Sequence, residues 1–144
     1  MTYTITATTW QIHRESLRHI RHVVFIHEQQ VPIADEWDDK DETAIHFLVS
    51  NIQGDAIGCA RLLIEENLLH IGRVAILREY REHGTGRQLM KFILEWREQQ
   101  YSHLKIYLHA QTSRIAFYKH LGFVAQGDVF MDAGIPHIEM WYQT

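Results

Sequence analysis

The segment from Arg81 to Arg87 has the composition of a phosphate-binding loop. It lies between a stretch typical of a buried strand, 70–76, and an amphipathic stretch typical of a helix. Gly84 and Gly86 let the backbone approach a ligand closely because they carry no side chain. The first amides of a helix lack intrahelical acceptors, and the helix dipole favours an anion there. The segment is therefore suited to bind a pyrophosphate through backbone N–H groups.

Spacing separates the kinds of phosphate site that this segment could form. A P-loop requires G-x-x-x-x-G-K-[ST], which occurs nowhere in the sequence. A dinucleotide fingerprint requires a third glycine or alanine, but Leu89 stands three positions after Gly86. The pattern that remains, R-x-x-G-x-G after a strand, resembles the coenzyme A loop of the GNAT superfamily of N-acetyltransferases, whose signature is Q/R-x-x-G-x-G/A.

A second pattern lies downstream of the loop. Residues 117–123, with the sequence FYKHLGF, resemble the F-Y-x-x-L-G-F segment of the same superfamily. This segment falls one strand and one helix after the loop, where that fold would place it. Residues 24–29, 108–111 and 134–140 further resemble the ElaA/YjcF-like branch. The resemblance therefore covers nearly the whole chain.

The resemblance implies how acetyl-CoA would be held. Backbone groups of a strand would pair with the pantetheine amides, one of these N–H groups could polarise the thioester carbonyl, and loop amides would hold the pyrophosphate. The cofactor-binding residues predicted in this way are Val74, Ala75, Ile76, Arg81, Glu82, His83, Gly84, Thr85, Gly86 and Arg87. An ordinary strand-to-helix turn is the alternative for the loop.

The resemblance also implies a general acid. Tyr118 matches the tyrosine that often protonates the departing sulfur in this superfamily. A phenol with an unperturbed pKa near 10 is protonated at pH 7 and can donate a proton. The alternative is a helix aromatic that packs beside Phe117 and Leu121.

The general base stays open at this stage. Water chains could remove the proton of the amine without a dedicated residue. The candidate side chains are Glu28, His46, His70, His109 and His137.

Two residues are predicted to bind the acceptor substrate. Glu28 ends the first expected helix, which borders the acceptor site in the fold resembled, and Arg73 is a strand arginine that needs a partner or a solvent cleft. The acidic run 35–42 would attract a cationic amine or form a solvated loop, and the second is the more common behaviour of charge runs.

Length and composition indicate one globular domain spanning residues 1–144. Hydrophobic residues make up 46% and charged residues 22%, as in ordinary globular proteins. The net charge of -4 argues against nonspecific binding to nucleic acid or to an anionic membrane. The absence of a signal-peptide pattern and of a long apolar run predicts a cytoplasmic location.

Cysteine and histidine usage predicts neither a disulfide nor a metal site. Cys59 is the single cysteine and lies in an apolar run, so a buried thiol is expected. The sequence has 11 histidines, but none shows a recognisable ligand spacing. After His27 and Glu28, for example, Val31 stands where an H-E-x-x-H motif requires its second histidine.

Hydrophobic periodicity predicts a mixed α/β fold with about four flanking helices around a mostly antiparallel sheet of six to seven strands. The expected strands span 3–7, 45–50, 56–64, 68–76, 105–110, 123–128 and 137–142. The expected helices include 16–29, one from the loop to residue 100, and 114–120. The strand-helix-strand unit after residue 68 implies a parallel pair at the centre, and the resemblance implies that this pair splays to admit the pantetheine arm.

These observations together predict an acetyl-CoA-dependent N-acetyltransferase. The amine of a small molecule or peptide would attack the thioester directly in a ternary complex. A CoA-binding sensor without turnover and a generic nucleotide-binding domain are the alternatives, because resemblance of fold alone does not establish catalysis. The identity of the acceptor and the formation of a homodimer stay open, since Trp37, Trp141 and Phe130 suit either an interface or a core.

Overall fold

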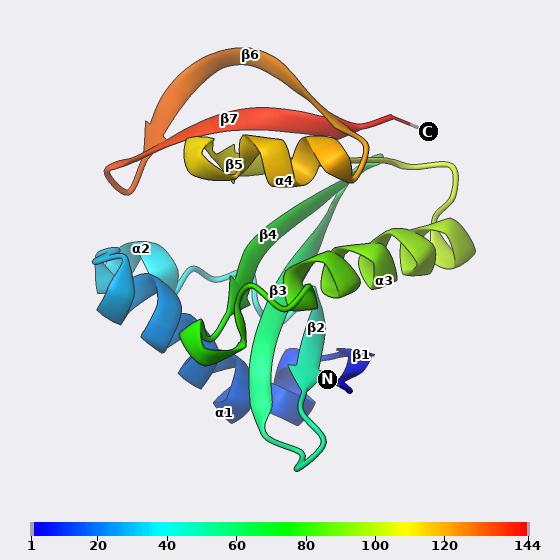
Figure 1. Cartoon of the computed structure of the whole chain (residues 1–144). Coiled ribbons are helices and arrows are strands. Elements are labelled where there is room, and N and C mark those ends of the chain that lie inside the picture. The colour runs from blue at the N-terminus through cyan, green and yellow to red at the C-terminus, as the bar shows by residue number, and fades with distance from the viewer. Residues whose placement is uncertain (1, 144) are drawn as a thin grey trace.

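The computed structural model describes residues 2–143, which build a seven-stranded sheet in the order β1-β2-β3-β4-β5-β7-β6 (Figure 1). The strands are β1 Thr4–Thr8, β2 Ile45–Ser50, β3 Ala56–Glu65, β4 Leu68–Ile76, β5 Lys105–Gln111, β6 Phe123–Asp132 and β7 Ile135–Tyr142. The α-helices are α1 Trp10–Arg21, α2 Ile33–Glu36, α3 Thr85–Gln100 and α4 Ile115–His120. A π-helical segment, His22–Glu28, follows α1, and short 3₁₀ turns span Arg78–Tyr80 and Thr112–Arg114.

The centre of the sheet is a parallel pair that stays together for only part of its length. Strand β4 pairs with β5 from Leu68 opposite Lys105 to Ile71 opposite Leu108. Beyond these residues the two strands diverge (Figure 1). Every other neighbouring pair in the described sheet is antiparallel. The predicted fold, a mostly antiparallel sheet with a splayed parallel pair at its centre, is confirmed.

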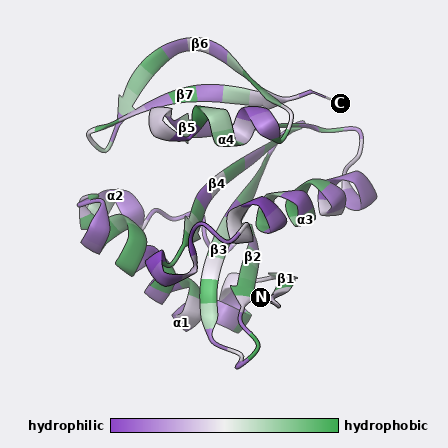
Figure 2. Cartoon of the chain, in the orientation of Figure 1, coloured by the Kyte–Doolittle hydropathy of each residue, from purple (hydrophilic) through white to green (hydrophobic). Residues whose placement is uncertain are grey.

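Apolar clusters on both faces of the sheet hold the helices. On one face Leu89, Met90 and Ile93 of α3 are fully buried in the larger cluster, as expected for an amphipathic helix. On the other face α1 packs against strand residues that include Cys59. Burial raises the pKa of the Cys59 thiol to about 12, so it is the neutral, buried thiol that the sequence predicts. Figure 2 shows α3 alternating between hydrophilic and hydrophobic residues along its length.

The first helix begins earlier than predicted. Helix α1 starts at Trp10 rather than Ser16, because the side chain of Thr9 accepts a hydrogen bond from the amide of Ile12 and caps the helix. This cap was hidden among the threonines of the preceding strand. The helical coil then widens into the π-helical segment, which ends at Glu28, close to the predicted end.

The last two strands are longer than predicted. Strand β6 continues to Asp132 and β7 begins at Ile135, so the pair forms a long hairpin. The pairing register shifts between Gln126 and Phe130, and Gly127 has a positive φ of 86°. A β-bulge of this kind interrupts the alternation of apolar and polar residues, although the strand continues beyond it.

The acidic run 35–42 is only partly the solvated loop that was predicted, because Glu36 and Asp41 are buried while its two ends and its centre are exposed. Three of its carboxylates bind three arginines in a largely buried ion network. Burial explains the pairing, because an unpaired buried charge is costly. The members of this ion network are Arg21, Arg61, Arg73, Glu36, Asp38 and Asp41.

The ion network joins elements that are distant in sequence. Arg21 of α1 is 1% exposed and places Nε 2.7 Å from Glu36 and Nη1 2.7 Å from Asp41. Arg73 of β4 places its Nε 3.0 Å from the same Glu36 oxygen. Glu36 therefore ties the first helix to the strand that borders the splay.

The charge state of Asp38 makes this network sensitive to acid. Burial opposes its ionisation, but the hydrogen bonds and charge of Arg61 prevail and lower the pKa of Asp38 to about 2. A carboxylate whose pKa is depressed in the folded state stabilises the fold above its unfolded pKa, and this contribution is lost as the pH falls towards 2. We expect Asp38→Asn to cost about 1 to 2 kcal/mol at pH 7 and less as the pH falls from 5 to 2.

Urea unfolding followed between pH 7 and pH 2 measures this difference. Asp39→Asn is the control, because Asp39 is exposed and forms no ion pair within residues 2–143. If the Asp38 variant and the wild type differed by the same amount at every pH, the assigned role of this carboxylate would be wrong.

Candidate functional site

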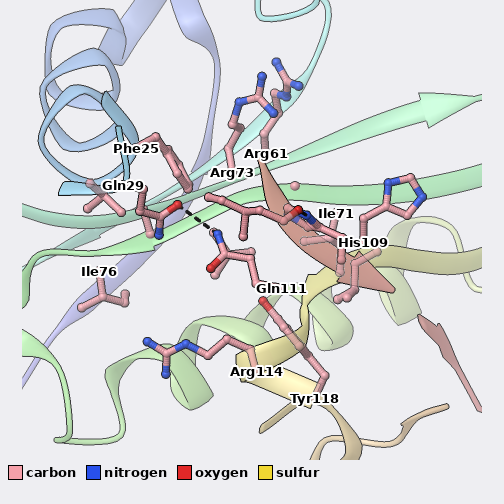
Figure 3. Close-up of a pocket in the computed structure, with 18 of the residues that line it drawn as sticks. Phe25, Gln29, Arg61, Ile71, Arg73, Ile76, His109, Gln111, Arg114 and Tyr118 are labelled. Carbon is pink, nitrogen blue, oxygen red and sulfur yellow. Dashed lines mark hydrogen bonds between the residues drawn. The ribbon is translucent and has the colours of Figure 1, made fainter. Parts of the chain in front are cut away.

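A cavity of about 790 Å³ opens where β4 and β5 part. Its walls come from these two strands, the loop before α3, helix α4, helix α2 and the β6–β7 hairpin. In Figure 3, Arg114 and Tyr118 lie on one side of the cavity and Arg61 and Arg73 on the other. Gln29 and Gln111 approach each other in the same view, where the Gln111 side chain donates a hydrogen bond of 2.9 Å to that of Gln29.

The predicted coenzyme loop presents a run of free amides. None of the backbone N–H groups of residues 82–87 has a hydrogen-bond acceptor within the described part of the chain. The first helical bond runs from the amide of Gln88 to the carbonyl of Gly84, 3.0 Å away. Gly84 has a φ of 80°, which a residue with a side chain adopts only with strain. The loop therefore has the donors and the conformation that an anion site at a helix N-terminus requires.

The predicted pantetheine strand borders the cavity. Val74, Ala75 and Ile76 all line it, and this half of β4 has no partner strand on its β5 side. Backbone groups on that edge are consequently available to a ligand, since the β-ladder does not use them.

A β-bulge changes the direction of β4 just before these residues. Arg61 of β3 faces Gly72 and Cys59 faces Ala75, so two residues of β4 lie opposite the single residue between them. One of these two is Arg73, whose φ of 53° is unusual for a residue with a side chain. Such a conformation persists only where the surroundings hold it. The contact with Glu36 in the ion network supplies that restraint.

Arg73 was predicted to need either a partner or a solvent cleft, and it has both. Its guanidinium binds Glu36 and Asp38, and the residue lines the cavity. Its predicted contact with the acceptor stays a prediction.

Glu28 and Arg81 lie together rather than at separate sites. Nη1 and Nη2 of Arg81 each donate to a different oxygen of Glu28 at 3.0 Å, and Nε donates to the carbonyl of Ile76 at 2.8 Å. Burial opposes ionisation of Glu28, but Arg81 outweighs it and lowers the pKa of this carboxyl. Glu28 is not among the described residues that line the cavity. Its assignment to the acceptor site stays a prediction, and this ion pair argues against it.

Tyr118 of α4 lines the cavity with an unused hydroxyl. The residue is 8% exposed, and its hydroxyl forms no hydrogen bond with any residue from 2 to 143. Burial raises its pKa to about 12, which keeps the phenol protonated. Its ring also packs edge to face on Phe117 and Phe123. The packing role and access to the cavity therefore coexist.

One of the five candidate bases is remote from the cavity, and another borders it with one ring nitrogen already in a hydrogen bond. His46 is 1% exposed, lies outside the described cavity lining and pairs through Nε2 with the carbonyl of Asp41 at 2.9 Å. His137 lines the cavity, but its Nδ1 donates to the carbonyl of Ile135 at 2.7 Å.

Two other histidines line the cavity and form pairs with carboxylates. Nδ1 of His70 lies 3.4 Å from Glu65, and Nε2 of His109 lies 3.3 Å from Glu139. The ring of His70 stacks on Tyr107, whose hydroxyl donates to the same Glu65. Sequence analysis did not identify these partners, although the alternation of Tyr107 and His109 along β5 indicates that they share a face.

Among residues 2–143, no group of three metal-ligating side chains is close enough to hold a metal ion. No helix in the described chain has the length and apolar character needed to cross a membrane.

Comparison with known proteins identifies the family. Residues 14–144 match the family described as the acetyltransferase (GNAT) domain. The chain belongs to the GNAT family. As a member of it, the protein is an acyltransferase that uses acyl-CoA.

Similar proteins cover nearly all of this GNAT chain. ElaA of Escherichia coli is 33% identical over 87% of the chain and 84% of its own length, and the N-acetyltransferase YjcF of Bacillus subtilis is 32% identical over 85% and 86%. The crystal structure of an acyl-CoA N-acyltransferase from Pseudomonas aeruginosa aligns with a TM-score of 0.90 at 30% identity and covers 99% of this chain and 100% of its own.

The coenzyme loop can be tested at Gly84. We expect Gly84→Ala to weaken acetyl-CoA binding at least about tenfold, because relaxing the positive φ would misalign the free amides and lose one hydrogen bond to a charged group. Isothermal titration calorimetry with acetyl-CoA measures the change.

Gly54→Ala is a matched control for this substitution. Gly54 has a φ of 86° and, like Gly84, no atom within 4 Å of an added Cβ, but it lies in the β2–β3 turn away from the cavity. Both substitutions should cost about 1 to 2 kcal/mol of stability. Equal effects of the two on coenzyme affinity would contradict the assignment of the loop.

Proposed function

We propose that this protein transfers the acetyl group of acetyl-CoA to a primary amine by direct attack within a ternary complex. The observation that carries the proposal is one continuous cavity bordered by the free loop amides, the Tyr118 hydroxyl and His70. These are the groups that a direct transfer needs, namely coenzyme donors, an acid and a base.

The coenzyme would lie between the loop and the free edge of β4. Amides of residues 82–87 would bind the pyrophosphate, and backbone groups of Val74, Ala75 and Ile76 would pair with the pantetheine arm. Arg81 would hold the loop in place rather than bind the phosphates, because its guanidinium already binds Glu28 and the carbonyl of Ile76. The loop would therefore attract the phosphates chiefly through its backbone.

His70 is the base best supported by the geometry. An ionised carboxylate only accepts hydrogen bonds, so Nδ1 must donate to Glu65 and Nε2 carries the lone pair. Nε2 has no partner within the described chain. Burial, with a further contribution from His109, lowers the pKa of His70, so the ring is neutral and able to accept a proton at pH 7.

The proposed reaction balances with these two residues. His70 Nε2 accepts the proton of the bound ammonium, and the neutral nitrogen attacks the thioester carbonyl. The new C–N bond forms as the C–S bond breaks. Tyr118 donates its phenolic proton to the departing thiolate, and its phenolate takes up the proton that the new amide nitrogen releases. The products are the amide, free CoA and one proton, which His70 passes to solvent. An enzyme-bound acyl intermediate is not required.

A thiol-release assay with acetyl-CoA and a panel of alkylamines, amino acids, aminoglycosides and peptides tests the proposal. On an accepted amine, we expect Tyr118→Phe and His70→Gln each to lower kcat by about 10² to 10⁴, with acetyl-CoA affinity preserved. Tyr101→Phe is the control for the tyrosine, because Tyr101 lies outside the cavity lining and packs on Trp96. Coenzyme binding without transfer to any amine would contradict the proposal.

The pH dependence separates the base from a structural role. Because the pKa of His70 is lowered from 6.5, kcat/KM should fall on the acidic side below that value, where the ring becomes protonated. This acidic limb should be lost in His70→Gln. An unchanged pH profile in that variant would assign proton removal to water or to another group.

A further inference from the structure

Glu65, the last residue of β3, has a partner at each of its two carboxylate oxygens. The hydroxyl of Tyr107 donates a hydrogen bond to Oε1, and Nδ1 of His70 lies 3.4 Å from Oε2. No lysine or arginine of residues 2–143 forms an ion pair with this carboxylate. The Glu65 side chain is 37% exposed, so burial alone does not fix its position. The contacts with Tyr107 and His70 therefore determine where the carboxylate points.

Tyr107 is itself fixed between two rings. It lies in β5 directly opposite His70 of β4 and directly opposite Trp141 of β7. Its ring stacks on that of His70 with centroids 4.5 Å apart and on that of Trp141 with centroids 4.7 Å apart, at interplanar angles of 13° and 22°. A ring packed on both faces keeps its hydroxyl in one direction. The stack thus directs the Tyr107 hydroxyl across β4 to Glu65.

The neighbouring histidine has a similar arrangement with the opposite ring nitrogen. Nε2 of His109 lies 3.3 Å from Glu139, and Nε1 of Trp141 donates to the other oxygen of Glu139 at 2.8 Å. A neutral histidine that donates from one ring nitrogen keeps the lone pair on the other. His70 donates from Nδ1, so its lone pair is on Nε2, the ring nitrogen farther from the backbone. Of these two histidines, only His70 is held in that form.

We propose that Tyr107 is a positioning residue for the base His70, an inference that rests on the proposed transfer reaction. By holding Glu65, its hydroxyl keeps the proton of neutral His70 on Nδ1 and leaves Nε2 free to receive the proton of the amine. Glu65 then stabilises the imidazolium that forms. Tyr107 and Glu65 are not among the described residues that line the cavity, so both act through His70.

Packing alone is the alternative role for Tyr107. That role requires the ring, which contributes to two aromatic contacts. The positioning role requires the hydroxyl as well. Tyr107→Phe removes the hydroxyl and keeps the ring, so this variant separates the two roles and is expected to fold.

The tautomer of His70 can be measured directly. Long-range proton–nitrogen correlation NMR on protein with isotope-labelled histidine distinguishes a protonated ring nitrogen from an unprotonated one, and His70→Gln identifies the signals of His70. At about pH 8, where an ordinary histidine is neutral, we expect the proton on Nδ1 in the wild type. Tyr107→Phe should weaken this preference, because one hydrogen bond no longer holds the carboxylate.

Glu65→Gln should have the larger effect on the tautomer. The single amide oxygen would accept from the Tyr107 hydroxyl, and the NH₂ group would then face Nδ1 of His70. A donor at that place favours the proton on Nε2, which would occupy the nitrogen that the reaction needs.

Kinetics on an accepted amine connects the tautomer with the reaction. We expect Glu65→Gln to lower kcat about 10- to 100-fold and Tyr107→Phe about three- to tenfold. KM for the amine should change little, because neither residue lines the cavity.

The pH profile provides a readout that a packing role would not change. The charges that act on His70 are those of Glu65, which raises its pKa, and of His109 and Arg61, which lower it, and Tyr107 stacks on its ring. Loss of the Glu65 charge should therefore move the acidic limb of kcat/KM to a pH about 0.5 lower.

Two substitutions serve as matched controls. Tyr142→Phe removes the hydroxyl of another strand tyrosine, which packs on Phe123 outside the cavity lining. Glu139→Gln changes the carboxylate that pairs with the other histidine. Neither should alter the tautomer of His70. Circular dichroism and acetyl-CoA affinity verify that each variant is folded.

A proton on Nε2 of His70 in the wild type would overturn the inference. So would a Tyr107→Phe variant that keeps both the tautomer and the kcat of the wild type, or one that loses kcat with the tautomer unchanged, as a packing role predicts. The expected tautomers without acetyl transfer to any amine would instead remove the proposed function, while the effect of Tyr107 and Glu65 on His70 would stand.

Discussion

The contact between Arg73 and Glu36 underlies the geometry of the whole site. It holds β4 in a left-handed conformation at the bulge, just beyond the last residue that pairs with β5. A residue with a side chain adopts such a φ only at a cost of about 1 to 3 kcal/mol, so the surrounding contacts must outweigh the strain. Glu36 also binds Arg21 of α1, and the first helix thereby fixes the strand on which acyl-CoA would lie. The splay and the ion network are parts of one arrangement.

The proposed reaction needs a positive environment for the phosphates and a neutral base for the amine. The groups proposed for these two roles lie at different places in the cavity. In the proposed reaction, phosphate binding needs donors and positive charge, which the amides of residues 82–87 and Arg114 would provide. Removing a proton from an amine needs a neutral base, and burial keeps His70 in that form. The elements that supply these groups come from different parts of the chain, so each environment is set by its own packing. The paired arginines between them contribute little net charge because their carboxylates accompany them.

The sequence was sufficient to predict features that depend on residues close together in the chain. The loop amides follow from two glycines at a helix start, and the central parallel pair follows from one strand-helix-strand unit. The ion network could not be predicted in this way, because Arg73 and Glu36 lie 37 positions apart and only the fold brings them together. The same reason hid the pairing of Glu28 with Arg81, 53 positions apart. The missed start of α1 was a different error, since the cap at Thr9 is local but is masked by neighbouring threonines.

The number of residues in the π-helical segment His22–Glu28 affects the direction of the side chains at its end. A π-turn takes up more residues than an α-turn, so it offsets the helical phase of everything that follows it. Glu28 and Gln29 leave the end of that segment in the directions that let them contact Arg81 and Gln111. Loss of one residue here would rotate both side chains about the helix axis without altering any contacting residue. The number of residues between α1 and Glu28 therefore helps to set these two contacts.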